Sequence, residues 1–156
     1  MKTVLISGGT GMVGQALTNT LVLQGYQVII LTRNPKKSSR ANVSFANWNI
    51  DTNEIDADAI KSSDIIIHLA GASVAEKRWT EKRKQEIIES RVQSSKLLVH
   101  AIKTIPNHIT TFISASAIGW YGPDTETSLQ NGFVETDPMD PSYLGTTCGV
   151  WEASVQ

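Results

Sequence analysis

The heptapeptide GGTGMVG, at positions 8–14, places three glycines at intervals of three residues. It follows an apolar run typical of a buried strand and precedes a segment whose apolar residues recur at helical spacing. A glycine turn between a strand and a helix binds dinucleotide phosphates, because the first helical turn offers free N–H groups and a positive dipole end. We predict such a site here, with a ligand-free turn as the alternative. An ATPase-type phosphate loop is disfavoured, because no Gly-Lys-Ser/Thr follows.

Each glycine has a separate predicted role in that turn. Gly8 permits a backbone conformation that a Cβ would obstruct. Gly11 lets a pyrophosphate approach the backbone, and Gly14 lets the helix pack closely on the strand.

The residues after the second expected strand, 27–32, indicate which dinucleotide the turn would take. NAD sites usually place an acidic residue on the adenosine ribose about 20 residues beyond the glycines, yet no acid lies between positions 28 and 37. Arg33 stands there, with Lys36, Lys37 and Arg40 nearby. A guanidinium pairs with a 2′-phosphate through two hydrogen bonds and stacks on adenine. The sequence therefore favours NADP(H) over NAD(H), with a solvated basic loop as the alternative.

Apolar runs alternate with segments of helical period along the chain. We predict strands at residues 3–7, 27–32, 43–48, 64–69 and 111–115. We predict helices at residues 12–24, 55–61 and 80–103, and from 141 or 142 to the chain end, with a loop at 124–141. This order predicts an α/β fold: a Rossmann-type, doubly wound parallel sheet in three α/β/α layers, with strand order 3-2-1-4-5.

Two helical faces are predicted to pack on this sheet. In the first helix, Val13, Leu17 and Leu21 recur at four-residue spacing and mark one face. The inner face of the helix at 80–103 is predicted to carry Ile88, Val92, Ser95, Val99 and Ile102. These side chains should therefore be buried.

Composition and charge narrow the classes of partner. The 156 residues carry a net charge of −1, which gives no electrostatic reason to expect nucleic acid or an anionic membrane. No stretch approaches the ~18 apolar residues of a membrane span. The single cysteine, Cys148, cannot form an internal disulfide, and the three histidines lack metal-ligand spacing. We therefore expect a soluble, cytoplasmic protein without a metal.

Four segments, in the order GGTGMVG, LTR, HLAGASV and ISASAIGWYG, resemble the extended branch of the short-chain dehydrogenase/reductase superfamily. That branch includes nucleotide-sugar epimerases and dehydratases. The block at 68–92, the segment SASAIGWYG and the terminal pattern C-x-x-W-E (Cys148, Trp151 and Glu152) are similar to the YfcH-type family of NAD-dependent epimerase-like proteins. The resemblance covers essentially the whole chain, and the block at 68–92 is its most specific part.

The resemblance implies a nicotinamide cofactor and hydride transfer at a carbon of a nucleotide-sugar. The implied cofactor-binding residues are Gly8, Thr10, Gly11, Met12, Val13, Gly14, Arg33, His68, Leu69, Ala70 and Gly71. Among them, His68 is expected to line the cofactor groove. The resemblance also implies that Ser116 is the active-site serine, although the loop after it is one residue longer than in the usual S-x-x-x-Y-G pattern.

The superfamily's catalytic pattern, Tyr-x-x-x-Lys, is incomplete in this chain. Its tyrosine is the general acid/base, and its lysine supplies the charge that lets the phenol ionise near neutral pH. Tyr143 matches the tyrosine, but Thr147 stands where the lysine belongs. The candidate catalytic residues are Ser116, Tyr143 and Tyr121, with packing as the alternative for both tyrosines. The missing lysine keeps open a second function, a non-catalytic NADP(H)-binding or redox-sensing module.

A run of charged residues occupies positions 76–85. Such a run at a helix start is mostly a solvated face. A contact with a substrate phosphate through Arg78, Arg83 or Arg91 is the alternative.

Members of the extended branch continue beyond the helix that follows strand five, into more sheet and a smaller region that closes over the sugar. We therefore expect residues 1–156 to be the NAD(P)-binding Rossmann domain alone, truncated after that helix and without the substrate-binding C-terminal region. The strand at 111–115 would then be an exposed sheet edge, with which a second copy could pair to form a homodimer.

Overall fold

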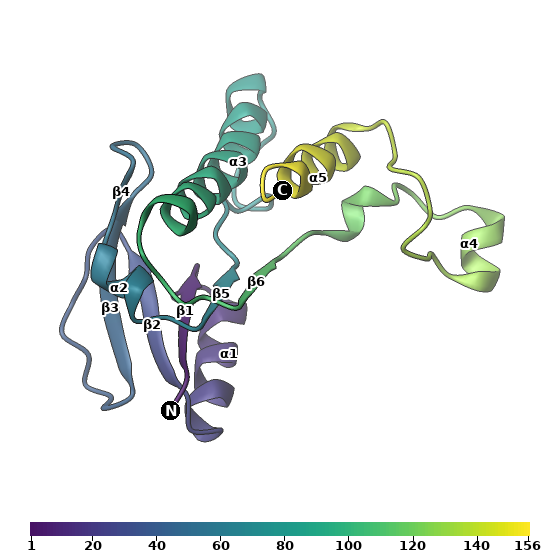
Figure 1. Ribbon diagram of the computed structural model, residues 1–156. Helices are drawn as coiled ribbons and strands as arrows, with labels where there is room; N and C mark the ends of the chain where they lie inside the picture. Colours follow the sequence, from purple (N-terminus) through teal and green to yellow (C-terminus); the bar gives the residue numbers. More distant parts are fainter. The chain divides into compact units, whose positions relative to one another are not determined.

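The computed structural model describes all residues from Met1 to Gln156 and divides into two compact units. The first unit is Met1–Ala115 and the second is Ser116–Gln156 (Figure 1). No helix in either unit combines the length and the apolarity that a bilayer crossing requires.

The first unit is built on a six-stranded sheet. Its strands are β1 (Thr3–Ser7), β2 (Gln27–Thr32), β3 (Val43–Asn49), β4 (Glu54–Ile55), β5 (Ile65–His68) and β6 (Thr111–Ser114). Their order is β4-β3-β2-β1-β5-β6, and every pairing is parallel except that of β3 with β4. β1 is central, because its Ile6 stands opposite Ile30 on one side and Ile67 on the other. The parallel strands follow the predicted order, so the Rossmann-type sheet is confirmed.

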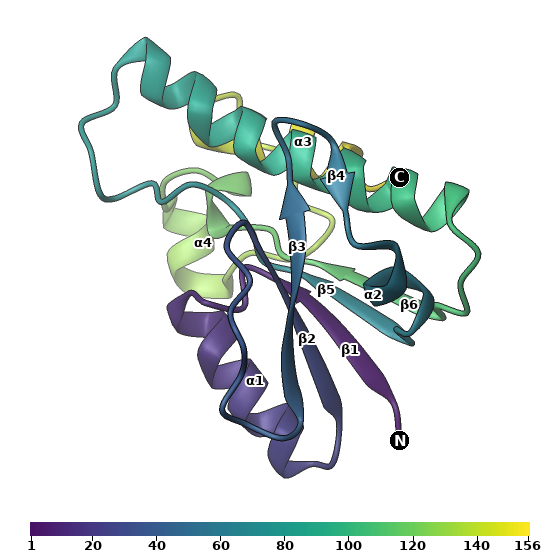
Figure 2. The same ribbon diagram turned by 90° about the vertical axis from the view of Figure 1, so that its left-hand side faces the viewer.

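Helices cover both faces of this sheet, as Figure 2 shows. They are α1 (Met12–Leu23), α2 (Ala57–Lys61) and α3 (Glu81–Thr104). Successive strand residues point to opposite faces. Val4 and Ile6 of β1 therefore belong to the core cluster against which Leu17 of α1 packs. Between them, Leu5 belongs to the second cluster, with Leu98 of α3. The predicted three-layer arrangement is confirmed.

The buried face of α3 differs from the predicted one. The buried residues are Arg83, Ile87, Ser94, Ser95, Leu97, Leu98 and Ala101. Only Ser95 belongs to the predicted set; Ile88, Val92, Val99 and Ile102 are half-buried along the border of that face. Apolar residues stand side by side in the pairs 87–88 and 98–99. Each residue turns a helix by about 100°, so two adjacent apolar residues lie on neighbouring faces. The spacing of apolar residues in α3 was therefore compatible with either face being buried.

The predicted face of α1 was also wrong at its first turn. Val13 is 60 % exposed, whereas Gly14 and Thr18 are buried and Leu17 and Leu21 are half-buried. Leu17 and Leu21 pack against the sheet, whereas Gly14 packs against the glycine turn and, having no side chain, gives no apolar signal in the sequence.

The segment predicted as a helix at 55–61 divides into two elements. Residues 54–55 form β4, in which Ile55 pairs antiparallel with Trp48. The helix α2 begins only after Asp56, whose carboxylate accepts hydrogen bonds from the backbone N–H groups of Asp58 and Ala59, at 2.9 and 3.1 Å. A two-residue strand is too short to leave a periodic pattern, and for that reason it was missed.

The second unit contains the short 3₁₀ helix η1 (Ile118–Trp120), α4 (Glu126–Asn131) and α5 (Tyr143–Ala153). The segment 124–141, predicted as a loop, therefore contains a helix. Its N-terminus is a capping box, in which Thr125 accepts from the Ser128 N–H and Ser128 accepts from the Thr125 N–H. The predicted final helix is confirmed, with Ser142 as its N-cap.

Candidate functional site

The glycine turn follows β1 directly, and its first glycine is required by backbone geometry. Gly8 has a φ of +74°, a region that favours glycine. A Cβ there would lie 2.8 Å from the carbonyl carbon of Leu69 and 2.9 Å from the nitrogen of Ala70. The turn thus runs in backbone contact with the segment after β5, and the predicted role of Gly8 in the turn is confirmed.

Gly14 brings α1 against the turn itself. A Cβ at Gly14 would lie only 2.6 Å from the Cα of Gly9. Close packing was predicted, but it is made with the preceding turn and not with the strand. Gly9 was missed as a constrained position: a Cβ there would lie 2.8 Å from Cγ2 of Ile30 on β2. The only feature of the sequence that pointed to a constraint at Gly9 was its place directly after Gly8.

The N-terminus of α1 is open. Its N-cap is Gly11, no side chain caps it, and its first turn carries no acidic residue. Met12 and Val13 are exposed, and a Cβ at Gly11 would meet only the Gly8 carbonyl oxygen, at 3.3 Å. The side chain of Gln15 holds the turn by donating to the carbonyl of Thr10, at 2.6 Å. The N–H groups at this helix start are uncapped, and Gly11 has no side chain in front of them. Such a terminus fits the phosphates of a dinucleotide.

Arg33 follows β2 at the same edge of the sheet, since Ser7 at the end of β1 pairs with Leu31. Its side chain is exposed and forms no hydrogen bond or ion pair within the chain. Arg40, by contrast, donates to Asn19 of α1, at 2.7 Å. Arg33 is therefore a cation without an internal partner beside the glycine turn.

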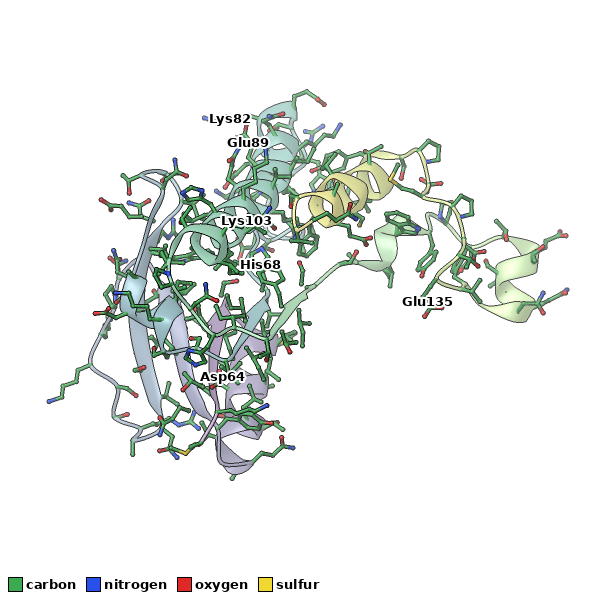
Figure 3. All side chains as sticks on the ribbon, viewed as in Figure 1. Asp64, His68, Lys82, Glu89, Lys103 and Glu135 are labelled. Atoms are coloured by element: carbon green, nitrogen blue, oxygen red, sulfur yellow. The ribbon has the colours of Figure 1, made fainter.

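His68, the last residue of β5, is completely buried between the sheet and α3 (Figure 3). Its Nδ1 lies 2.5 Å from the hydroxyl of Ser7, and its Nε2 lies 3.1 and 3.2 Å from the hydroxyls of Ser95 and Ser94. Burial lowers the pKa of His68 from 6.5 to about 4, so the ring is neutral near neutral pH. The sequence predicted that His68 lines the cofactor groove, but its side chain is buried and lines no open groove. It joins β1, β5 and α3 from within.

The segment after β5 is fixed from both sides. The Leu69 N–H donates to the carbonyl of Ser7, at 3.0 Å, and the Ala70 N–H to the Ser7 hydroxyl, at 3.4 Å. From α3, Arg91 donates to the carbonyl of Ala72, at 3.1 Å. The side chain of Arg91 also fills the space that a Cβ at Gly71 would need. Leu69, Ala70 and Gly71 are thus a held loop beside the glycine turn, as a cofactor contact requires.

Arg83 has a structural place as well. It is 6 % exposed, donates to the carbonyl of Ser73 and forms an ion pair of 2.7 Å with Glu86. The contact with a substrate phosphate considered for Arg83 and Arg91 stays a prediction. Their observed contacts explain both residues as supports of the loop.

In the second unit, Ser116 follows β6 by two residues and donates a hydrogen bond to Oε1 of Glu152 on α5. The thiol of Cys148 lies 3.5 Å from the carbonyl of Ala117. A Cβ at Gly119 would lie 2.9 Å from Cβ of Leu144. The α5 residues that contact segment 116–119 are therefore Leu144, Cys148 and Glu152, at four-residue spacing.

Tyr143 and Thr147 stand one residue earlier on α5, which turns them by about 100° from that face. Thr147 is buried, and its hydroxyl donates to the carbonyl of Tyr143, at 2.6 Å. Its hydroxyl is thus used within the helix, and no lysine stands in either four-residue series. Catalysis by Tyr143 stays a prediction. Glu152 was missed as a site residue, although the pattern C-x-x-W-E contained it.

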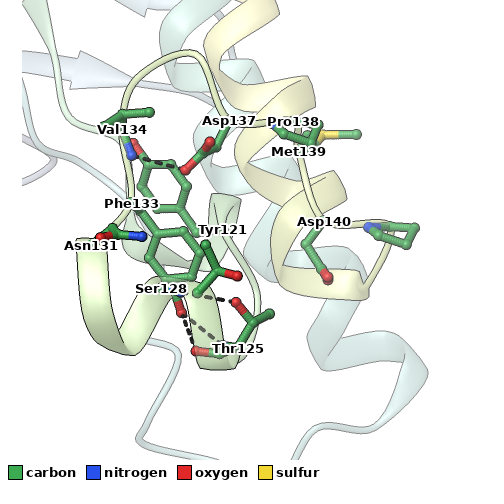
Figure 4. Close-up of a pocket in the computed structure, with 13 residues that line it drawn as sticks. Tyr121, Thr125, Ser128, Asn131, Phe133, Val134, Asp137, Pro138, Met139 and Asp140 are labelled. Carbon is green, nitrogen blue, oxygen red and sulfur yellow. Dashed lines mark hydrogen bonds between the residues drawn. The ribbon is translucent and has the colours of Figure 1, made fainter.

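Tyr121 lies in a pocket of about 500 Å³ within the second unit (Figure 4). Its ring is stacked on that of Phe133, with ring centroids 4.8 Å apart. Both rings line the pocket with the loop residues Asp137, Pro138 and Met139. This geometry agrees with the packing alternative for Tyr121, and its catalytic role stays a prediction.

Comparison with known proteins gives consistent matches. The chain is 35% identical to the epimerase family protein YfhF of Bacillus subtilis over 98% of its length, and 39% identical to the epimerase family protein SSP1921 of Staphylococcus saprophyticus over 97%. It spans about half the length of these curated relatives, 49% of each.

Solved structures show the same fold. The human epimerase family protein SDR39U1, solved with NADPH, superposes on 99% of this chain with a TM-score of 0.80 and 26% identity, over 48% of its own length. MoeE5, solved with UDP-glucuronic acid and NAD, superposes with a TM-score of 0.76 at 22% identity, covering 98% of this chain and 48% of its own. The model of the NAD dependent epimerase/dehydratase family matches residues 4–144. This chain belongs to the NAD dependent epimerase/dehydratase family.

Proposed function

We propose that this chain binds NADP(H) through the glycine turn and is the cofactor-binding part of an oxidoreductase. The observation that carries the proposal is the open N-terminus of α1 behind a turn in which Gly8, Gly11 and Gly14 leave no side chain. Such a terminus holds phosphate through its N–H groups and its dipole. The loop at Leu69–Gly71, held beside the turn, is the second wall of the proposed site.

The preference for NADP(H) is assigned to Arg33. No acid stands in the stretch 28–37 to accept the ribose hydroxyls, and Arg33 has no partner within the chain. A guanidinium in that state pairs with a 2′-phosphate at little cost, because no existing contact must break.

A direct test is a fluorescence titration with NADPH and with NADH. The wild type should bind NADPH more tightly, and Arg33→Ala should lower the NADPH affinity to that of NADH. Arg40→Ala is the matched control: it removes the same charge from the same loop, but its guanidinium is already held by Asn19. Equal NADPH affinity in wild type and Arg33→Ala would refute the assignment.

The proposed reaction is hydride transfer at a carbon of a nucleotide-sugar, as in an epimerase. The bound nicotinamide would supply the hydride chemistry. The chain's own contribution is assigned to Ser116, which polarises the reacting oxygen, with Tyr143 and Tyr121 as further candidates. Turnover of NADP⁺ by the full-length protein with a panel of nucleotide-sugars tests this proposal.

A second function is favoured by one observation. The hydroxyl of Thr147 is buried and bonded within α5, so the position of the usual lysine carries no charge. A chain that binds NADP(H) without turnover, as a binding or redox-sensing module, would fit that feature. Tight NADPH binding with no turnover of any nucleotide-sugar would favour this function over the first.

A further inference from the structure

The acidic side chain of Glu152 stands beside the proposed active-site serine. Ser116 donates its hydroxyl proton to Oε1 of Glu152, and Glu152 takes part in no ion pair. Ser116 is exposed, whereas Glu152 is half-buried. A serine hydroxyl has one proton and two lone pairs. With its proton turned to a carboxylate, Ser116 presents lone pairs to a ligand.

The arrangement is held by the body of α5. Leu144, Cys148 and Glu152 contact segment 116–119 on three successive turns of this helix. At the start of α5, Gly145 comes so close to the carbonyl of Asp140 that a Cβ there would clash with it. The backbone of α5 at position 152 is therefore held by packing along the helix, and from there the carboxylate reaches Ser116.

We propose that Glu152 is a positioning residue that holds the proton of Ser116, so that Ser116 meets the reacting hydroxyl of the substrate as an acceptor. This inference rests on the proposed function. In the oxidation step, the substrate O–H proton passes to Oγ of Ser116 while the proton of Ser116 passes to Glu152. When bound, an oxidised nicotinamide would accept the hydride from the same substrate carbon, so that the alcohol would become a ketone. The reverse movements reduce the ketone.

The inference accounts for a chain without the usual lysine. A lysine assists a phenol by stabilising its anion, whereas a carboxylate assists a hydroxyl by accepting its proton. Thr147 can do neither, because its hydroxyl is bonded within the helix. Glu152 is the acidic residue that α5 carries on the face toward Ser116.

The contact is tested without any turnover by NMR of the Glu152 side-chain carboxyl carbon. Replacing Ser116 by alanine should shift this resonance, because the carboxylate loses its hydrogen-bond donor. Ser154→Ala is the matched control, since Ser154 is also on the last turns of α5 but donates to the carbonyl of Trp151. An unchanged Glu152 resonance in Ser116→Ala would overturn the inference, whatever the enzyme does.

The chemical role is tested by steady-state kinetics with NADP⁺ and a nucleotide-sugar. Glu152→Gln should lower kcat about a hundredfold with KM little changed, since proton acceptance contributes to the transition state. Glu152→Asp should recover part of the rate. In a Ser116→Ala background, Glu152→Gln should have no further effect.

Two kinetic results would overturn the inference: full activity in Glu152→Gln, or losses in kcat that multiply in the double variant. Glu126→Gln, an exposed glutamate on α4, controls for the change of charge. If no nucleotide-sugar is turned over by the full-length wild-type protein, the proposed function fails and this inference fails with it; an unchanged Glu152 resonance overturns the inference even where turnover is seen.

Discussion

The glycine turn at residues 8–14 and the Ser116 region differ in what builds them. The turn is built from backbone: Gly8 has a positive φ, and Gly14 leaves room for the backbone of Gly9. The Ser116 region is built from side chains on one face of α5, and a single residue step along the helix changes which of them faces Ser116. The first region keeps the superfamily's glycine pattern, and the second lacks the lysine of the superfamily's Tyr-x-x-x-Lys pattern.

This difference teaches where a family pattern is dictated by physics. A backbone that runs in contact with another backbone accepts only glycine, so the pattern is fixed residue by residue. A helix face can carry another proton-accepting group without changing the fold. The cofactor turn is thus constrained by geometry, and the chemistry beside Ser116 is free to vary.

The largest effect is expected from Gly14→Val, which adds a side chain where the glycine turn is packed backbone against backbone. Its branched side chain would be forced against Gly9, and backbone atoms cannot move away cheaply. We expect a loss of about 3 kcal/mol in the free energy of unfolding, measured with urea, or failure to fold. Gly11→Ala should change that free energy by about 1 kcal/mol or less, because its Cβ would meet a single oxygen, at 3.3 Å, which needs a shift of only a few tenths of an ångström. Equal losses in the two variants would contradict this view of the turn.

A nearly equal effect is expected from pH, through His68. Its pKa is about 4 in the folded chain and near 6.5 when unfolded, because burial disfavours the charged ring. The unfolded chain therefore binds a proton first, and stability is lost as pH falls from about 6.5 to 4. The loss from this group approaches ~3 kcal/mol below pH 4.

Urea unfolding at several pH values checks this expectation. His68→Asn should reduce the slope of stability against pH in that window, whatever its stability at pH 7. His100→Gln, an exposed histidine on α3, should leave the slope unchanged. An unaltered slope in His68→Asn would show that other groups cause the acid sensitivity.

The sequence predicts the sheet well because buried parallel strands are continuous apolar runs, as at 27–32. It predicts the glycine turn because that conformation admits few residue types. It could not predict the burial of His68, because the sequence of a residue at the carboxyl end of a strand is the same whether its side chain is buried or exposed. Its bonds to Ser94 and Ser95 arise only when α3 is docked.

The same limit applies in the Ser116 region. The sequence matched Tyr143 to the catalytic tyrosine and found Thr147 in place of the lysine, whereas the contacts of α5 also bring Leu144, Cys148 and Glu152 toward segment 116–119. Residue spacing alone cannot tell which series faces segment 116–119, because the series 143 and 147 and the series 144, 148 and 152 both recur every four residues. The capping box of α4 was missed because its third residue is Ser128 and not the Glu or Gln of the usual pattern, and the prolines nearby pointed to a loop.

A smaller effect is expected from Thr125→Ala in the side-chain-built second unit. The change removes the hydroxyl that accepts from the Ser128 N–H at 3.1 Å. We expect a loss of about 1 kcal/mol, confined to α4 and seen as faster amide hydrogen exchange there. Thr127→Ala, inside the same helix, should leave the exchange of α4 nearly unchanged. Similar amide exchange rates in both variants would show that the Thr125 cap does not stabilise α4.

The central claim, that GGTGMVG binds a dinucleotide, is tested most directly by NADPH titration of the wild type and of Gly11→Val. The added Cβ would meet the Gly8 carbonyl oxygen at 3.3 Å and no other atom within 4 Å, so the side chain enters the space at the N-terminus of α1 at the cost of a small local shift. We predict that Gly11→Val weakens NADPH binding by at least about tenfold, or about 1.4 kcal/mol, with the urea unfolding curve nearly unchanged. Equal NADPH affinity in the two proteins would contradict the claim.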